Sequence, residues 1–273
     1  MSTQSEKAIR FRAMHDGPGA FVIPNPWDIA SAQILAGLGF KALATSSAAS
    51  ACAIGKKDGA LSRGEALDHA RTIVNSCDLP VSADLEKGFG VKPETVAETV
   101  RLAAEVGLVG CTIEDSTGNP ENPLFDFSLA VERIAAAAEA AHALDLPFML
   151  TARAHNFLYA NPSLNETIKR LQAFEKAGAE VLFAPGLPDI DSVRDVCSAL
   201  SKPFNFMVGI NGKSFSVAEL EAAGVRRISL ATSLYRAAMT GFLEAANEVK
   251  EKGTFEFLER AVMTAELTQL MKR

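Results

Sequence analysis

Short runs of apolar and β-branched residues alternate along the chain with longer stretches whose apolar residues recur at helical spacing. The short runs predict β-strands at residues 20–24, 41–46, 80–85, 109–115, 147–153, 180–185, 204–209 and 226–232. The intervening helical stretches include residues 93–107, 128–144, 165–178 and 216–225. Most of them end at a glycine or a proline shortly before the next strand. The pattern therefore predicts eight successive strand–helix units.

Strands that alternate with helices form parallel sheets, so the chain is predicted to be an α/β protein. Eight units of roughly thirty residues each match the size of a (β/α)8 TIM barrel. We expect a single barrel domain over residues 1–273, because no Pro/Ser-rich linker divides the chain. The alternative is a doubly wound sheet, but residues 22–35 lack the Gly-x-Gly-x-x-Gly turn that usually follows its first strand.

Composition narrows the class of partner rather than the fold. The chain is 48% hydrophobic and 22% charged, which is typical of a globular protein with a sizeable core. Its net charge of -6, without a cluster of Lys and Arg, argues against nucleic acid or an anionic membrane as partner. We expect a cytoplasmic protein, because no apolar run approaches the ~20 residues of a membrane span and the start has no signal region.

Polar side chains follow four neighbouring predicted strands at the point where each strand ends. In a (β/α)8 barrel these strand ends form the active-site face, so the side chains should share one pocket. The candidates are Thr45, Ser46 and Ser47 after the second strand, Asp84 and Glu86 after the third, Glu114 and Asp115 after the fourth, and Arg153 and His155 after the fifth. The sequence thus predicts acids, hydroxyls and a guanidinium around one cavity.

The acids suggest a metal site. Asp84 and Glu86 are two positions apart, and the period of a strand would turn both carboxylates to the same side. Packed like charges raise one another's pKa unless a cation lies between them. With Glu114 on the next strand, the three acids suit Mg²⁺ or Mn²⁺, since Mg²⁺ prefers a few carboxylates plus water and substrate oxygens. Solvated loop acids, and an ion pair with Arg153, are the alternatives.

Three ordered motifs carry a family resemblance. They are Ser-Ala-Asp-Leu-Glu-Lys-Gly-Phe-Gly at residues 82–90, Thr-Ile-Glu-Asp at 112–115 and Leu-Thr-Ala-Arg at 150–153. Together with the hydroxyl-rich turn and the pair Asp58–Gly59, they resemble the isocitrate lyase/phosphoenolpyruvate mutase superfamily over roughly residues 21–240. The resemblance implies a magnesium-dependent barrel acting on 2-oxo acids or enolate-forming carboxylates. It also implies a homo-oligomer, a dimer or tetramer, whose C-terminal helical extension (about 241–273) swaps between subunits.

The resemblance further implies roles for the acids. Asp84 would ligate the metal directly, whereas Glu86 and Glu114 would act mostly through metal-bound water. Asp58 matches an acid on the loop after the second strand that lies near metal and substrate. The catalytic set implied in this way comprises Asp58, Glu86, Glu114 and Arg153.

Substrate contacts are implied by the same comparison. The turn at Thr45, Ser46 and Ser47 would hold the substrate carboxylate, and Arg153 would hold oxygens at its other end. His155 stands where the family usually has an acid, and we expect it to contact the substrate together with Asn122. Asn119 and Asn122 match an asparagine in the loop of phosphonomutases and related hydrolases, but the lysine of that loop is absent.

The loop after the fourth strand departs most from the family. Isocitrate and methylisocitrate lyases carry a Lys-x-Cys-Gly-His motif there, whereas residues 114–127 contain no Lys, Cys or His. We therefore expect a magnesium-dependent lyase of another 2-oxo or 2-hydroxy acid, cleaving a C–C bond or decarboxylating through a pyruvate-type enolate. Phosphonomutase-like or phosphonopyruvate-hydrolysing P–C chemistry is the second hypothesis, and an oxo-acid binder without turnover is the third. We also expect residues 116–127 to form a mobile lid.

Overall fold

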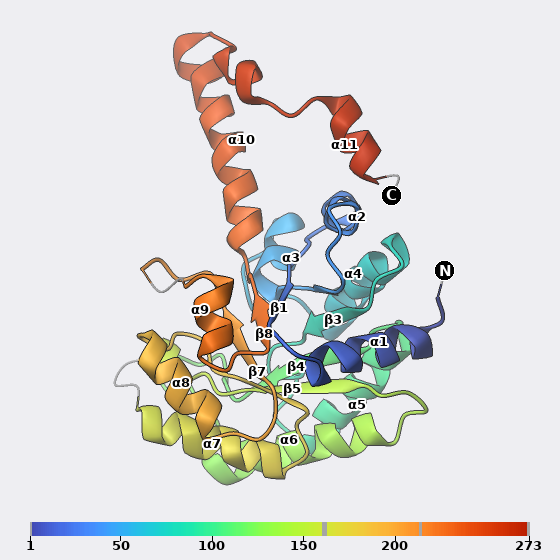
Figure 1. Ribbon diagram of the computed structural model, residues 1–273, viewed down its shortest axis with the longest axis vertical. Coiled ribbons are helices and arrows are strands. Elements are labelled where there is room, and N and C mark those ends of the chain that lie inside the picture. Colours follow the sequence, from blue (N-terminus) through green and yellow to red (C-terminus); the bar gives the residue numbers. More distant parts are fainter. Residues whose placement is uncertain (1, 160–162, 213–214, 272–273) are drawn as a thin grey trace.

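The computed structural model describes residues 2–159, 163–212 and 215–271, and its centre is a parallel sheet of eight strands (Figure 1). The strands are β1 (Phe21–Ile23), β2 (Leu43–Ala44), β3 (Val81–Asp84), β4 (Gly110–Glu114), β5 (Met149–Arg153), β6 (Val181–Phe183), β7 (Phe204–Met207) and β8 (Arg227–Ser229). Their order is β1-β8-β7-β6-β5-β4-β3-β2. The backbone N–H of Ala44 donates to the carbonyl of Pro24 at 3.1 Å, which links β2 to the end of β1. The predicted (β/α)8 barrel is confirmed.

Helices alternate with the strands. They are α1 (Gln4–Asp16), α2 (Ile29–Gly37), α3 (Ser47–Ala53), α4 (Arg63–Ser76), α5 (Pro93–Glu105), α6 (Phe127–His142), α7 (Leu164–Lys176), α8 (Ile190–Ser198), α9 (Val217–Ala222), α10 (Ser233–Lys252) and α11 (Thr264–Met271), with 3-10 turns η1 (Asn156–Leu158) and η2 (Glu256–Arg260). The four helical stretches named from the sequence correspond to α5, α6, α7 and α9. Gly178 shows why a glycine ends such a helix: its φ is 103°, and a Cβ there would lie 2.9 Å from the side chain of Ala138.

The first helix closes one end of the barrel. Phe11 and Ala8 of α1 pack against Val109, Met149 and Val181, which lie where β4, β5 and β6 begin. Figure 1 shows α1 lying across this end of the strands. The opposite end, where the strands finish, is thus the end available for the site, as in other (β/α)8 barrels.

The C-terminal helices form an arm that leaves the barrel (Figure 1). No residue of α10 is buried, and the side chains of Phe242, Leu258 and Met263 are 63%, 62% and 71% exposed. The chain then returns, and α11 packs against α2 so tightly that a Cβ on Gly37 would lie 2.1 Å from the carbonyl oxygen of Leu270. The expected exchange of this arm between subunits stays a prediction. No helix within the described ranges is long and apolar enough to cross a membrane.

Candidate active site

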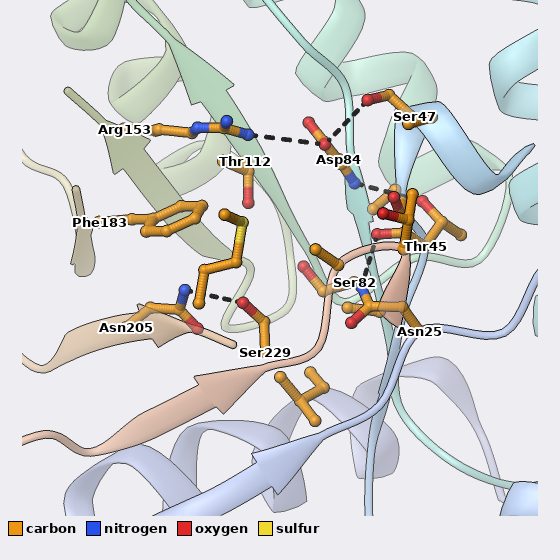
Figure 2. A pocket seen from close by; sticks show the side chains of 18 of the residues that line it. Asn25, Thr45, Ser47, Ser82, Asp84, Thr112, Arg153, Phe183, Asn205 and Ser229 are labelled. Atoms are coloured by element: carbon orange, nitrogen blue, oxygen red, sulfur yellow. Dashed lines mark hydrogen bonds and ion pairs between the residues drawn. The ribbon is translucent and has the colours of Figure 1, made fainter. Parts of the chain in front are cut away.

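Asp84 lies at the end of β3 and connects the strand to the hydroxyl-rich turn (Figure 2). Its carboxylate accepts hydrogen bonds from Ser47 Oγ and from the backbone N–H of Glu86, both at 3.1 Å. Its own backbone N–H donates to Thr45 Oγ1 at 3.2 Å. Ser46 caps α3 by accepting a hydrogen bond from the N–H of Ala49. The predicted juxtaposition of the turn and the acid is therefore present.

The backbone places Glu86 near the site through a turn, whereas the sequence analysis expected a strand. The strand ends at Asp84, so the inference that strand periodicity aligns the two carboxylates is wrong. Glu86 lies in a turn with φ 51°, a left-handed conformation that non-glycine residues rarely adopt. Burial, followed by repulsion from Asp84 and Asp58, raises the pKa of Glu86 to about 7. The acids thus interact electrostatically as expected, although the backbone that brings them together is a turn.

Arg153, at the end of β5, joins the acids of two neighbouring strands. Its Nη1 lies 3.3 Å from Glu114 Oε2 and 3.8 Å from Asp84 Oδ2. Its Nη2 lies 3.0 Å from His155 Nε2, and His155 Nδ1 lies 3.3 Å from Glu114 Oε1. Because a guanidinium can only donate, a neutral His155 accepts at Nε2 and carries its proton on Nδ1, facing Glu114. Arg153 is therefore held in place by a carboxylate and an imidazole.

The pKa values of the two strand-end carboxylates are shifted in opposite directions. Burial raises the pKa of Asp84, and Arg153 offsets this only in part. Burial also acts to raise the pKa of Glu114, but Arg153 and His155 outweigh it, so that this pKa is lowered. Glu114 is thus the main counter-charge of Arg153. Asp84 and Glu86, whose pKa values are both raised, are the acids that a further cation would stabilise.

Asp115 has a structural role beside the site. It is buried, accepts a hydrogen bond from the backbone N–H of His155 at 2.8 Å and pairs with Arg170 Nη1 at 3.1 Å. These contacts fix the chain after β5. They give Asp115 a structural role, because it does not line the cavity that Asp84 lines.

A cavity of about 190 Å³ lies beside Asp84 and Arg153. This is smaller than the roughly 300 Å³ at which pockets for drug-sized ligands begin, so the cavity suits a molecule of a few carbon atoms. The predicted residues that line it are Thr45, Ser46, Ser47, Asp58, Asp84 and Arg153. Not all the strand-end side chains share it as expected: its lining does not include Glu86, Glu114, Asp115 or His155. Further lining residues that the sequence analysis missed include Asn25, Ser82, Thr112, Phe183, Asn205, Arg227 and Ser229.

The missed residues fall into two groups. Asn25 follows β1 and joins three strands, donating from Nδ2 to the carbonyl of Thr45 at 3.0 Å and accepting the N–H of Leu230 at 2.9 Å. The same strand-end rule could have found it. Asn205 and Arg227 lie within β7 and β8, and their signal was a polar residue inside an apolar run.

The loop after β4 lies apart from the cavity lining. Asn122 is exposed and does not line the cavity, and its carbonyl accepts a hydrogen bond from the Thr117 hydroxyl. Lys87 Nζ donates to the carbonyl of Thr117 at 2.7 Å, and Ser116 Oγ lies 2.8 Å from the hydroxyl of Tyr159. These bonds tie the loop to its neighbours. The roles of Asn122 in substrate binding and of this loop as a lid stay predictions.

The donor set fits a hard divalent cation. Asp84 and Glu86 offer oxygens, and burial raises the pKa values of both acids. Repulsion adds to this, from Glu114 and Asp58 for Asp84 and chiefly from Asp84 and Asp58 for Glu86. In the part of the chain that the structure describes, no three His, Cys, Asp or Glu side chains are grouped as a metal cluster. Mg²⁺ prefers one or two carboxylates plus water and substrate oxygens, and Asp84 and Glu86 would be the carboxylates.

Comparison with known proteins identifies a family whose sequence model matches this chain. The sequence model of the family described as "Phosphoenolpyruvate phosphomutase" matches residues 11–250. A crystal structure of a Burkholderia cenocepacia J2315 protein shares 48% identity and a TM-score of 0.96, covering 99% of this chain and 97% of that one. The crystal structure of 2,3-dimethylmalate lyase shares 28% identity and a TM-score of 0.86, covering 99% and 95%. Oxaloacetate decarboxylase of Pseudomonas syringae pv. tomato is 28% identical over 248 residues, 88% of this chain and 84% of that protein.

Proposed function

This chain belongs to the phosphoenolpyruvate phosphomutase family, and we propose that it is a divalent-metal-dependent lyase of a small 2-oxo or 2-hydroxy carboxylic acid. The observation that carries the proposal is the cavity of about 190 Å³ bounded by Asp84, Arg153 and the hydroxyl-rich turn. Its lining contains groups that can bind a metal ion, bind a substrate carboxylate and stabilise a negative charge that develops during the reaction. Relatives named as lyases and as an oxaloacetate decarboxylase support an enzymatic role.

Substrate carboxylate binding is assigned to Ser47, Thr45 and Arg153. The Nε–H of Arg153 is buried and has no hydrogen-bond partner among the described residues, so it can donate to a substrate oxygen. Its contacts with Glu114 and His155 keep the guanidinium from rotating. A guanidinium fixed in this way orients a carboxylate and stabilises negative charge as a bond next to the 2-oxo group breaks.

Asp84 would hold the divalent cation, Mg²⁺ or Mn²⁺, with Glu86 and Glu114 in its surroundings. When bound, the ion supplies positive charge that stabilises the oxygen of a pyruvate-type enolate. Asp84 is positioned for this role because Ser47 and the N–H of Glu86 fix both its oxygens. The guanidinium carbon of Arg153 lies 4.9 Å from the centre of the Phe183 ring. This ring would help to exclude water from that face of the guanidinium.

The loop over the site limits the reactions that fit. Residues 116–127 contain no Lys, Cys or His that could protonate a departing carbanion in the manner of isocitrate lyases. A reaction that releases carbon dioxide needs no such donor on the leaving group. Decarboxylation of an oxaloacetate-like acid is therefore favoured over cleavage of isocitrate. Cleavage of a substituted malate would release a carbanion that needs a proton donor from elsewhere than residues 116–127.

Product assays test the proposal: pyruvate is measured for every substrate, and in addition glyoxylate for isocitrate and phosphoenolpyruvate for phosphonopyruvate. The substrates are oxaloacetate, 2,3-dimethylmalate, phosphonopyruvate, isocitrate and 2-methylisocitrate, each with Mg²⁺ and with EDTA. Product formation should require the metal, should fall at least a hundred-fold in Asp84→Asn, and should be unchanged in Arg194→Met, whose exposed ion pair lies away from the cavity. Preference for phosphonopyruvate would support cleavage of a P–C bond instead. Phosphonopyruvate is included because the matching family is named after a phosphomutase. Rapid isocitrate cleavage, or no turnover of any substrate, would refute the proposal.

A further part of the proposal is that the enzyme is a cytoplasmic homo-oligomer. The arm formed by α10, η2 and α11 supports the homo-oligomer. Phe242, Leu258 and Met263 leave an apolar surface on the arm that a second subunit could cover. Light scattering should show a dimer or tetramer for the intact chain. Substitution Phe242→Glu should weaken that assembly, whereas a monomeric intact chain at micromolar concentration would contradict it.

A further inference from the structure

A second arginine, Arg227, is buried inside the barrel and has no counter-charge. Only 4% of its surface is exposed. Its Nε donates to Asn205 Oδ1 at 2.8 Å and its Nη2 donates to Thr151 Oγ1 at 3.0 Å. Both partners are neutral. Its Nη1 is buried without a hydrogen-bond partner among the residues that the structure describes.

The other buried arginines are compensated. Arg153 lies 3.3 Å from Glu114, and Arg170 pairs with Asp115 at 3.1 Å. Arg133 instead donates to the carbonyls of Lys87, Gly90 and Val91. Burial alone lowers the pKa of Arg227, to about 9, so the guanidinium keeps its charge at neutral pH. An isolated buried charge is costly, and proteins keep such charges mainly where a ligand or function uses them.

The position of Arg227 is within reach of a ligand in the active site. It lines the same cavity as Asp84 and Arg153, and in the sheet it is paired in register with Asn205. Figure 2 shows Asn205, hydrogen-bonded to Ser229, on the side of the cavity away from Asp84. A ligand that fills the cavity can therefore contact the acid end and the Arg227 end at once.

His15 of α1 does not supply the missing negative charge. Its Nδ1 bonds to the carbonyl of Phe11 at 2.8 Å, and its Nε2 is buried without a partner among the described residues. Burial and then the charge of Arg227 lower the pKa of His15 to about 3, so the imidazole is neutral. A neutral ring cannot cancel the charge of Arg227.

We propose that Arg227 binds the second anionic group of a small dianionic substrate whose first carboxylate lies near Ser47 and Arg153. The proposal rests on the proposed function for the placement of that first carboxylate. It adds a specificity residue on the opposite side of the cavity. A monoanion of the same length would leave Nη1 of Arg227 unpaired, and sites with unpaired buried polar groups discriminate strongly against such ligands.

Succinate and butyrate provide a matched pair of probes, because they share four carbons and differ in the second carboxylate. We would measure their affinities by calorimetry in the presence of Mg²⁺ for the wild-type chain, Arg227→Met, Arg227→Lys and Arg226→Met. Arg226 is the control because it is the preceding residue, is half-buried and donates to the carbonyl of Gly19 outside the cavity. Its substitution removes the same charge.

The wild-type chain should bind succinate about ten- to a hundred-fold more tightly than butyrate, as expected for a charge-assisted hydrogen bond. Arg227→Met should lose that preference, Arg227→Lys should retain part of it, and Arg226→Met should keep all of it. Equal binding of the two probes by the wild-type chain, or an unchanged preference in Arg227→Met, would overturn the proposal. If the Arg227 variants do not fold, a crystal of the wild-type chain with succinate decides: a carboxylate bonded to Arg227 supports it, and succinate bound elsewhere refutes it.

The result is separable from turnover. The binding measurement requires no reaction of either probe. A chain that prefers succinate through Arg227 but releases no pyruvate from any substrate would refute the proposed function alone. A chain that turns over an oxo acid but ignores the second carboxylate of succinate would refute only the role of Arg227.

Discussion

Replacing Arg153 by methionine should turn a compensated group of acids into an uncompensated one. The guanidinium lies 3.3 Å from Glu114 and 3.8 Å from Asp84, and methionine retains bulk without the charge. The three side chains are only 11%, 12% and 18% exposed, for Arg153, Glu114 and Asp84 respectively. Removing one partner of a buried pair costs about 3–5 kcal/mol because a carboxylate is left without compensation.

We expect the lower end of that range, about 3 kcal/mol, because the contact to Asp84 is long. For a chain of this size the loss corresponds to a fall in melting temperature of about 6–12 °C. The loss should depend on pH. In the wild-type chain Arg153 helps to lower the pKa of Glu114, which stabilises the fold above the unfolded pKa and is lost as the pH falls through the folded value. The difference between the variant and the wild type should therefore shrink on acidification.

Denaturant unfolding in EDTA at pH 8 and at about pH 3.5, which lies below the ordinary glutamate pKa of 4.5, measures both effects. Arg194→Met is the matched control, because Arg194 and Asp191 form an ion pair whose side chains are 55% and 81% exposed, and such pairs contribute little. If Arg153→Met is as stable as Arg194→Met at pH 8, Arg153 does not compensate the buried acids and the electrostatic description of the site is wrong.

Three further changes have defined outcomes. Asp84→Asn should abolish Mg²⁺ binding in calorimetry, because a site with few protein carboxylates cannot replace a lost one, and unchanged affinity would exclude Asp84 as a ligand. Protonated Glu86 stabilises the metal-free fold below about pH 4.5, and this contribution is lost as the pH rises through about 7. Glu86→Gln should therefore gain stability relative to the wild-type chain between pH 5 and 8 in EDTA. Parallel curves of stability against pH for the two chains would contradict the raised pKa of Glu86. Lys87→Met removes the 2.7 Å bond to Thr117 and should speed hydrogen exchange across residues 116–127, whereas unchanged exchange would show that the loop is held by its other bonds.

The barrel could be predicted because its signals are local and repeated. Each strand is an apolar run, and the residue that ends it, such as Asp84 or Arg153, falls at the carboxyl end of the barrel by topology alone. Glu86 was misplaced because the strand stops two residues earlier and a left-handed turn replaces its periodicity. Turn conformations of this kind depend on tertiary contacts, which no period in the sequence records.

Arg227 was missed for a different reason. A charged residue inside an apolar run can face solvent, a neighbouring acid or the barrel interior, and the sequence does not distinguish these cases. Only the structure shows that its partners are Asn205 and Thr151, which are neutral. The arm was recognised as a helical extension, but its return to α2 depends on the close contact of Leu270 with Gly37, which are far apart in the sequence.

The charges of the site predict that metal and anion bind together. The acids in and beside the cavity are Asp58, Asp84, Glu86 and Glu114, and the permanent cations are Lys87, Arg153 and Arg227. When all four carboxylates are ionised, the seven groups carry a net charge of -1. A divalent cation changes that charge to +1, so it should favour a dianion by attraction as well as by direct contact. Because linkage is reciprocal, succinate should raise the affinity for Mg²⁺ by the same factor by which Mg²⁺ raises the affinity for succinate. Calorimetric titrations in both orders test this, and independent binding of the two ligands would show that the acids are not the metal site or that the anion binds outside their field.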